Sequence, residues 1–419
     1  MDLTFCRSKT VHPVCKRFFD LFMVKRYFGV SKPAVILGIE TSCDETGCAV
    51  VDSNANILGE ALHSQHLLHL NRGGIVPPLA QDLHREHITE VCEKALRSAN
   101  LRLRDVDAIA ATVKPGLPLS LDIGTKFGKY LSKLGGKPFI PIHHMEAHAL
   151  TARMIEKVDF PFLVLLVSGG HCLLAVVKDV GKFYLLGGTI DDAPGEAFDK
   201  SSRRLKMRNI PDYKDLNGGA AIELAASRAT DPFQFSFEPT MPHYKDCNFS
   251  FAGMKNMLLT FTKKQEKEYN ILGDGIIPDL NNLCAGFQIA VARHVCHRTK
   301  RAMIFCQTKE LLPQENPTLV VSGGVACNNF LAKGLNIVCS ELGYKFVRPP
   351  PQLCTDNGIM IAWNGVEKWM ADIGVLRDQK EINEVVIQRR APLGEDWTEK
   401  VRKASISCKM IKPHQFYDS

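Results

Sequence analysis

A chain of 419 residues is too long for one simple hydrophobic core, so its length predicts two lobes. No apolar run approaches the ~20 residues that cross a bilayer, and the sequence therefore predicts no membrane insertion. The 14 cysteines include no C-x-x-C pair, which argues against a zinc ribbon or a thioredoxin-type site, and the net charge is +7.

Most of the excess positive charge lies in the first 33 residues. They contain seven lysines and arginines against Asp2 and Asp20, a net charge of +5, with phenylalanine and leucine between the basic residues. This composition is typical of a mitochondrial presequence, and the alternative is a basic tail with no targeting role. We therefore expect residues 1–33 to direct the chain to the mitochondrial matrix.

The next segment, residues 35–52, contains two apolar runs separated by a short polar turn, which predicts a β-hairpin. Asp44 and Glu45 lie in the turn, side by side.

His144 and His148 are one helical turn apart, so both imidazoles can reach the same ion. A possible carboxylate partner lies far downstream at Asp356. The residue after His144 is Met145, whereas a zinc protease of the H-E-x-x-H type needs glutamate there. The pair therefore predicts a metal site that does not hydrolyse peptides, and the alternative is two buried, hydrogen-bonded histidines.

Residues 162–178 repeat the plan of the first hairpin, with Ser168-Gly169-Gly170-His171 as the turn. A third glycine turn, at 322–324, follows the apolar run 318–321 and opens a helical segment. Two hairpins and a strand–glycine–helix unit predict an α/β protein with the two-lobed actin-like fold, in which two RNase H-like subdomains flank a nucleotide cleft. Glycine turns let backbone N–H groups approach phosphate oxygens, although no Walker A sequence is present.

These elements predict the domain organisation. We expect a presequence at residues 1–33 and an N-terminal lobe at 34–150. A C-terminal lobe at 151–375, with a helical insertion around 195–275, and a C-terminal tail at 376–419 should follow.

Six short segments, in this order, resemble successive signatures of one family, the tRNA N6-adenosine threonylcarbamoyltransferases. The resemblance spans about residues 36–362 and is closest to the mitochondrial members in animals. The segments are Gly38–Thr46, His143–His148, Leu166–His171, Gly195–Lys200, Phe249–Lys255 and Cys354–Asn357.

The resemblance implies an acyl transfer to tRNA. The family moves a threonylcarbamoyl group from threonylcarbamoyl-AMP to the exocyclic amine of the adenosine 3′ of the anticodon, and AMP leaves. The tRNAs read codons that begin with adenine. The implied partners are a mitochondrial tRNA and a separate synthase that supplies the acyl-adenylate, with the chain as a monomer or homodimer.

The resemblance also implies roles for single residues. His144, His148 and Asp356 match metal ligands, for one divalent ion per chain; such a set suits zinc or iron better than magnesium. For Asp356 the alternative is an N-cap of the following helix, and both roles are compatible. Asp44 and Glu45 match an acidic pair near the chemistry, and we expect Glu45 to accept the amine proton; for Asp44 the alternative is a turn cap. Positions that hold the acyl-adenylate or nucleotide are matched by Leu166, Val167, Ser168, Gly169, Gly170, Asp199, Gly219 and Asn328.

The sequence departs from the family pattern in the N-terminal lobe. Arg72 stands for a usual tyrosine, Pro78 for a glutamate and Lys114 for a glycine. Further on, the densest basic cluster of the folded region predicts a contact with the tRNA backbone, and the alternative is a solvated helix face. Its members are Lys200, Arg203, Arg204, Lys206 and Arg208.

Two other function classes remain at this stage. A sugar-kinase-like ATPase would share the fold but has no need for the two histidines and Asp356 to meet at a metal. A metal-dependent protease would use the metal but lacks the general base at residue 145.

Overall fold

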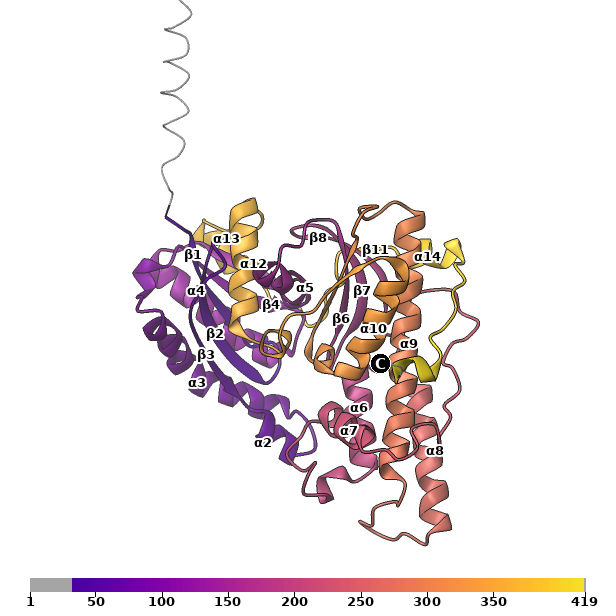
Figure 1. Ribbon diagram of the computed structural model, residues 1–419. Coiled ribbons are helices and arrows are strands. Elements are labelled where there is room, and N and C mark those ends of the chain that lie inside the picture. The colour runs from indigo at the N-terminus through magenta and orange to yellow at the C-terminus, as the bar shows by residue number, and fades with distance from the viewer. Residues whose placement is uncertain (1–31, 418–419) are drawn as a thin grey trace, which may run out of the picture. The chain divides into compact units, whose positions relative to one another are not determined.

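The computed structural model describes residues 32–417, and the residues from Val35 onward form one compact unit (Figure 1). The predicted presequence lies outside the described residues, apart from its last two positions. Within the compact unit, the first β-sheet is mixed and has five strands. They are β1 (Val35–Glu40), β2 (Glu45–Asp52), β3 (Ile57–Ser64), β4 (Ala108–Lys114) and β5 (Phe139–His143).

The second β-sheet is also mixed and has six strands. Its last strand is a two-residue addition at the edge from near the end of the chain. The strands are β6 (Phe162–Val167), β7 (Cys172–Asp179), β8 (Lys182–Gly188), β9 (Thr318–Ser322), β10 (Lys345–Val347) and β11 (Glu395–Asp396).

The two sheets have the same topology. The first has the order β3-β2-β1-β4-β5, and the second, without β11, has the order β8-β7-β6-β9-β10. In each sheet, the first three strands pair in antiparallel orientation. The last two strands run parallel to the first strand and lie on its other side. This repeat of an RNase H-like subdomain confirms the predicted α/β, two-lobed actin-like fold.

Helices cover both faces of the first sheet. Helices α3 (Pro77–Ser98) and α4 (Pro118–Gly135) pack on one face, and α12 (Gly358–Ala371) packs on β1, β2 and β4. The approach of α12 depends on glycine, because a Cβ at Gly38 would come within 2.2 Å of the backbone nitrogen of Ala362. A helix from late in the chain is thereby held tightly against the first strand.

Helix α5 (His144–Ile155) connects the two sheets. It contacts β6 and β9 of the second sheet and also α12, as Figure 1 shows near its centre. Alternate residues of β6 divide between two hydrophobic clusters, because successive side chains of a strand point to opposite faces. Phe162, Val164 and Leu166 share one cluster with residues of α5 and α12, so this core stabilises both sheets together.

The other face of the second sheet carries the longest described helix, α9 (Leu280–Thr308), with α10 (Asn329–Leu342) packed on it. Between β8 and α9 the chain forms α6 (Pro194–Arg204), α7 (Gly218–Ser227) and α8 (Ala252–Glu268). These three helices occupy the region where the sequence predicted a helical insertion.

The last segment, predicted as a C-terminal tail, contains α13 (Gln379–Glu384), β11 and α14 (Thr398–Ala404). Ile382 is buried in the core of the first sheet, whereas Val401 and Ile411 are buried in the core on α9. The lobe boundaries at residues 150 and 375 stay predictions. Among the described residues, no helix is long and apolar enough to cross a membrane.

Candidate functional site

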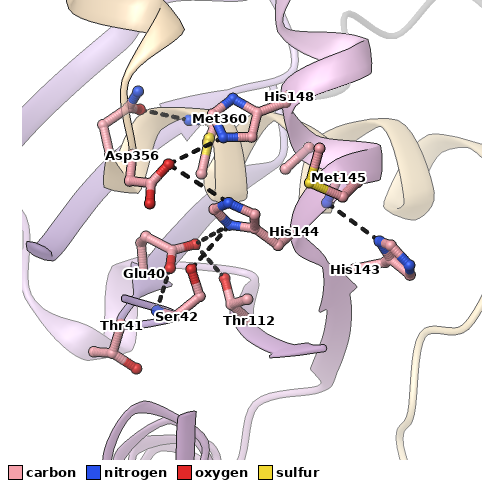
Figure 2. Close-up of polar contacts among 12 residues, drawn as sticks. Glu40, Thr41, Ser42, Thr112, His143, His144, Met145, His148, Asp356 and Met360 are labelled. Atoms are coloured by element: carbon pink, nitrogen blue, oxygen red, sulfur yellow. Dashed lines mark hydrogen bonds and ion pairs between the residues drawn. The ribbon is translucent and has the colours of Figure 1, made fainter. Parts of the chain in front are cut away.

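His144, His148 and Asp356 meet where α5 begins and α12 approaches, as Figure 2 shows. Their ligand atoms all lie within 4.8 Å of one another. Oδ1 of Asp356 is 3.1 Å from Nε2 of His148 and 3.5 Å from Nε2 of His144. Both imidazoles therefore present the same kind of nitrogen to one carboxylate oxygen, across 208 residues of sequence.

The start of α5 fixes the two histidines. Nδ1 of His143 accepts a hydrogen bond from the backbone N–H of Met145 at 3.2 Å, so His143 is the N-cap of the helix and not a third ligand. His144 and His148 then follow on one face of the first helical turns, with ring centroids 4.7 Å apart. The single carboxylate of this turn, Glu146, pairs with Lys368 at 3.2 Å, so it is engaged elsewhere than at a metal-bound water.

Asp356 is free of the capping role that was its alternative interpretation. Asn357 is the N-cap of α12 and accepts from the backbone N–H of Met360 at 2.9 Å. Asn357 also donates to the carbonyl of Thr355 at 2.7 Å, which braces the turn on both sides of Asp356. The alternative role of Asp356 as an N-cap is therefore wrong, because the neighbouring side chain caps the helix, and its role as a ligand stays a prediction.

A buried polar network lies behind His144. Its Nδ1 is 3.2 Å from Oε2 of Glu40 and 3.1 Å from Oγ of Ser42, and Thr112 donates to the same Glu40 oxygen at 2.6 Å (Figure 2). Burial alone would lower the pKa of His144, but the carboxylates of Asp356 and Glu40 outweigh it and raise the pKa to about 9.

Asp44 ends the first hairpin turn and Glu45 begins β2, near the same cluster. Burial, with the negative charges of Asp44 and Asp356, raises the pKa of Glu45 well above its ordinary value. Ser64 donates to Oε1 of Glu45 at 3.3 Å. The structure thus brings Glu45, with Asp44 beside it, within electrostatic reach of the carboxylate of Asp356.

His84, from α3, holds this turn in place. Its Nε2 is 3.0 Å from the carbonyl of Cys43, and its Nδ1 is 2.7 Å from Oγ1 of Thr46. Because a carbonyl only accepts, Nε2 carries the proton and Nδ1 accepts from the hydroxyl. His84 is completely buried and was not singled out from the sequence.

The second hairpin turn contains residues that the sequence predicted to hold the acyl-adenylate. Leu166 and Val167 are completely buried in β6, so any contact with a ligand would use their backbone. Ser168, Gly169 and Gly170 form the turn beyond them, closed by the hydrogen bond from the backbone N–H of Ser168 to the carbonyl of His171 at 2.8 Å. A Cβ on Gly169 or Gly170 would meet nothing within 4 Å, which leaves open space around the turn.

Of the remaining nucleotide candidates, Gly219 and Asn328 lie at helix starts and Asp199 lies within a helix. Asp199, inside α6, accepts from the backbone N–H of Gly218 at 2.8 Å, and burial raises its pKa. Gly219 follows in the first turn of α7. Asn328 is the N-cap of α10 and accepts from Leu331 at 2.8 Å, so one of its polar atoms is already used.

The basic cluster is largely engaged with protein groups. Lys200 pairs with Glu196 and Asp192, while Arg204 and Lys206 both pair with Glu266. These contacts give three of the five positive charges an internal role. Arg203 and Arg208 donate to Gly73 and Asn71, next to the departure at Arg72.

Two residues near the metal cluster were not assigned from the sequence. Glu40 is completely buried behind His144, and its only sequence signal is a carboxylate at the end of an apolar strand. His171 is close enough for His144 to affect it electrostatically: burial first, and then that neighbouring charge, lower its pKa to about 4. Both lie in the quoted family segments, but only tertiary packing gives them a place.

The donor set fits a divalent ion. Two imidazole nitrogens and one carboxylate oxygen converge, and the second nitrogen of His144 is oriented by a carboxylate and a hydroxyl, as is usual around histidine ligands. Nδ1 of His148 is buried and has no hydrogen-bond partner among the described residues. His144, His148 and Asp356 are therefore the residues that would hold the ion.

The comparisons with known proteins agree with one another. The TsaD family model, tRNA N6-adenosine threonylcarbamoyltransferase, matches residues 56–363. The chain is 48% identical over 378 residues to the Homo sapiens protein called tRNA N6-adenosine threonylcarbamoyltransferase, mitochondrial, covering 90% of each chain. It is 47% identical over 382 residues to a Danio rerio protein of the same name, covering 91% of this chain and 94% of the other. A Rhizobium johnstonii tRNA N6-adenosine threonylcarbamoyltransferase is 43% identical over 337 residues, with 80% and 88% covered.

Proposed function

Because the chain belongs to the tRNA N6-adenosine threonylcarbamoyltransferase family, whose members are transferases that modify tRNA, we propose the specific reaction of its site. The chain transfers a threonylcarbamoyl group from threonylcarbamoyl-AMP to the exocyclic amine of the adenosine 3′ of the anticodon. Its substrates are mitochondrial tRNAs that read codons beginning with adenine, and AMP is released.

The observation that carries this proposal is the convergence of two groups of residues from distant parts of the chain. His144, His148 and Asp356 form the metal cluster, and the turn with Asp44 and Glu45 lies within electrostatic reach of it. A sugar kinase has no use for the first group, and a protease of the zincin type would need a free carboxylate where Met145 stands.

The chemical step needs alignment and one proton acceptor. The amine nitrogen attacks the carbonyl carbon of the carbamoyl group, a C–N bond forms, and the bond from that carbon to the AMP oxygen breaks. Because the mixed anhydride is already activated, the protein mainly positions the two reactants. We assign the ionised carboxylate of Glu45 as the acceptor of the amine proton and Asp44 as its partner, since the negative charges that raise the pKa of Glu45 make its carboxylate a stronger base.

The metal site supports the same step. When bound, a divalent ion supplies Lewis-acid charge that can hold the phosphate or polarise the carbamoyl oxygen. Zinc or iron suits the donor set better than magnesium. Glu40 and Ser42 keep Nδ1 of His144 engaged, so that Nε2 faces the site.

The acyl-adenylate is held by the second hairpin turn and the adjoining helix starts. The N–H groups of Gly169 and Gly170 suit phosphate oxygens, because this turn leaves open space around the glycines, and Ser168 would contribute its hydroxyl, since its own N–H is bonded to His171. Asp199, Gly219 and Asn328 would contact the ribose, threonyl or base groups. A separate synthase supplies the donor, and the enzyme acts as a monomer or homodimer in the mitochondrial matrix.

The test uses the full chain, in-situ-generated threonylcarbamoyl-AMP and an unmodified mitochondrial tRNA that reads an adenine-first codon. Mass spectrometry of the digested nucleosides should show the adduct, with AMP release dependent on tRNA. Glu45→Gln should slow transfer about 100-fold while tRNA still binds, and Glu60→Gln, an exposed carboxylate on β3, should not. AMP release without tRNA, or no adduct from folded metal-loaded chain, would contradict the reaction; normal transfer by Glu45→Gln would remove the role of Glu45.

A further inference from the structure

Two cysteine thiols meet at the edge of the site. Cys327 is the last residue of the short helix η3 (Gly324–Cys327), and Cys354 is the last residue of α11 (Pro351–Cys354). The two short helices are in contact, and each thiol affects the other electrostatically. Cys354 Sγ is 3.2 Å from the carbonyl of Pro349, and Cys327 Sγ is 3.8 Å from that of Pro351, so one proline-rich turn contacts both.

The two thiols differ in access to solvent. Cys354 is completely buried, whereas Cys327 is only partly buried. The neighbouring Cys354 thiol, aided by the guanidinium of Arg348, lowers the pKa of Cys327 to about 7. Arg348 is fixed beside it, because it donates to the carbonyl of Ala326 at 3.1 Å and to Oδ1 of Asn329 at 3.2 Å. An accessible thiolate beside a second thiol is the arrangement found in redox-reactive cysteine pairs.

A second pair in the described chain offers a built-in comparison. Cys48 and Cys92 also influence each other electrostatically, but both are buried in the core between β2 and α3. The contact with Cys92 and burial raise the pKa of Cys48 well above its ordinary value. Both pairs consist of neighbouring thiols, but only the first pair has a thiol that solvent can reach.

We propose that Cys327 and Cys354 form a reversible disulfide in response to a small-molecule disulfide oxidant of the glutathione type. The Cys327 thiolate attacks one sulfur of glutathione disulfide, the bond between its sulfurs breaks, and one glutathione thiolate leaves and takes a proton from water. The Cys354 sulfur then attacks the Cys327 sulfur, and the second glutathione leaves with the Cys354 proton. Two protein thiols are oxidised, and one glutathione disulfide is reduced to two glutathiones.

The position of the bond gives it a consequence for the site. Cys327 directly precedes Asn328, a candidate nucleotide contact, and Cys354 is separated from Asp356 only by Thr355. A covalent link would tie η3 to α11 and restrict the turn that carries Asp356. The effect of the disulfide on the site rests on the proposed function, whereas formation of the disulfide does not.

The test treats the full chain with mixtures of glutathione disulfide and glutathione, followed by alkylation and non-reducing peptide mass spectrometry. We expect a Cys327–Cys354 cross-link that dithiothreitol reverses, while Cys48 and Cys92 stay reduced. In Cys354→Ser, glutathione should accumulate on Cys327, and in Cys327→Ser, Cys354 should stay unmodified. No cross-link at any ratio, equal oxidation of Cys48 and Cys92, or glutathione on Cys354 in Cys327→Ser would each overturn the proposal.

The functional arm compares reduced and oxidised chain for metal content and tRNA modification. Oxidation should lower metal affinity and transfer about tenfold in the wild type, the size of effect seen when groups around a metal ligand are disturbed, and should leave Cys327→Ser unchanged. A cross-link with unaltered metal content and transfer would remove the consequence for the site and leave the disulfide. If the cross-link forms but even reduced chain transfers nothing, the proposed function fails and the modification site stands.

Discussion

The carboxylate of Glu40 lies 3.2 Å from Nδ1 of His144, on the side of the imidazole that faces away from Asp356. Thr112 donates to this carboxylate at 2.6 Å, and the side chain of Glu40 has no exposure to solvent. A buried carboxylate that is held in this way can orient a histidine ligand and keep the imidazole proton on Nδ1, so that Nε2 can bind a metal ion. Glu40 is therefore part of the proposed metal site without being one of the proposed ligands.

Replacement of this carboxylate should weaken metal binding. Glu40→Gln keeps the shape of the side chain but removes its charge, so we expect metal affinity to fall about 10-fold to 100-fold. Competition with a chelator of known affinity measures the change. Glu60→Gln, on the exposed edge strand of the same sheet, is the matched control and should bind as the wild type does. Equal affinity in both variants would leave Glu40 with a purely structural role.

The neighbouring histidines should separate in their effects. His144→Ala removes a ligand, so bound metal and tRNA modification should both be lost. His143→Ala removes the N-cap of α5 and leaves a cavity where a buried ring stood, which together should cost about 2–5 kcal/mol of unfolding free energy and leave metal binding intact. Metal analysis of the purified variants and urea unfolding give both quantities. Loss of metal from His143→Ala at temperatures where it is folded would contradict the assignment of ligand and cap.

His84 should act through the turn that it holds. It bonds the carbonyl of Cys43 and the hydroxyl of Thr46, on either side of Asp44 and Glu45. His84→Ala would leave both groups buried without a partner, at a cost of about 1–3 kcal/mol each, and would loosen the acidic turn.

The kinetic signature distinguishes a positioning role from loss of stability. At temperatures where the variant is folded, we expect kcat to fall about tenfold or more, with KM for tRNA little changed. His84→Gln offers both an N–H donor and a carbonyl acceptor, so it should recover part of kcat. His87→Ala, three residues further along α3, is the control. A change in KM alone would place His84 in tRNA binding instead.

Local patterns in the sequence predict those parts of the fold and site that depend on neighbouring residues. The spacing of His144 and His148 places both rings on one helix face without any knowledge of the rest of the chain. The repeated hairpin plan predicts the repeated order of strands in the two sheets, because the neighbouring strands of each hairpin pair with each other.

Contacts between segments that are distant in the sequence could not be predicted from local patterns. Glu40 joins His144 across 104 residues, and α12, from late in the chain, packs on the first sheet through a close approach at Gly38. The alternative role of Asp356 as a helix cap is wrong for a local reason, since two adjacent residues can each start the helix and only the backbone geometry favours Asn357. The basic cluster likewise gave no sign that Glu266, from another helix, neutralises part of it.

Glu266 predicts how acid affects the stability of this region. Its carboxylate accepts hydrogen bonds from Arg204, with one pair of atoms at 2.9 Å, and from Lys206 at 3.1 Å. The hydrogen bonds from Arg204, and then those from Lys206, lower the pKa of Glu266 to about 2 from an ordinary value of 4.5. The folded state therefore holds the charged carboxylate at acidities where the unfolded chain has begun to protonate it.

The sign of the effect follows from this difference. A depressed carboxyl pKa stabilises the folded state above pH 4.5, and this stabilisation is lost as the pH falls from 4.5 toward 2. Glu266→Gln should therefore lower the unfolding free energy by about 1 kcal/mol at neutral pH, a value reduced for the partial exposure of the pair. The difference from wild type should shrink below pH 4.5, as urea unfolding at a series of pH values would show. Glu268→Gln, an exposed carboxylate near the end of the same helix, should give a small difference that does not vary with pH. A Glu266→Gln difference that stayed constant down to pH 3 would mean that packing, and not charge, accounts for the contribution of Glu266.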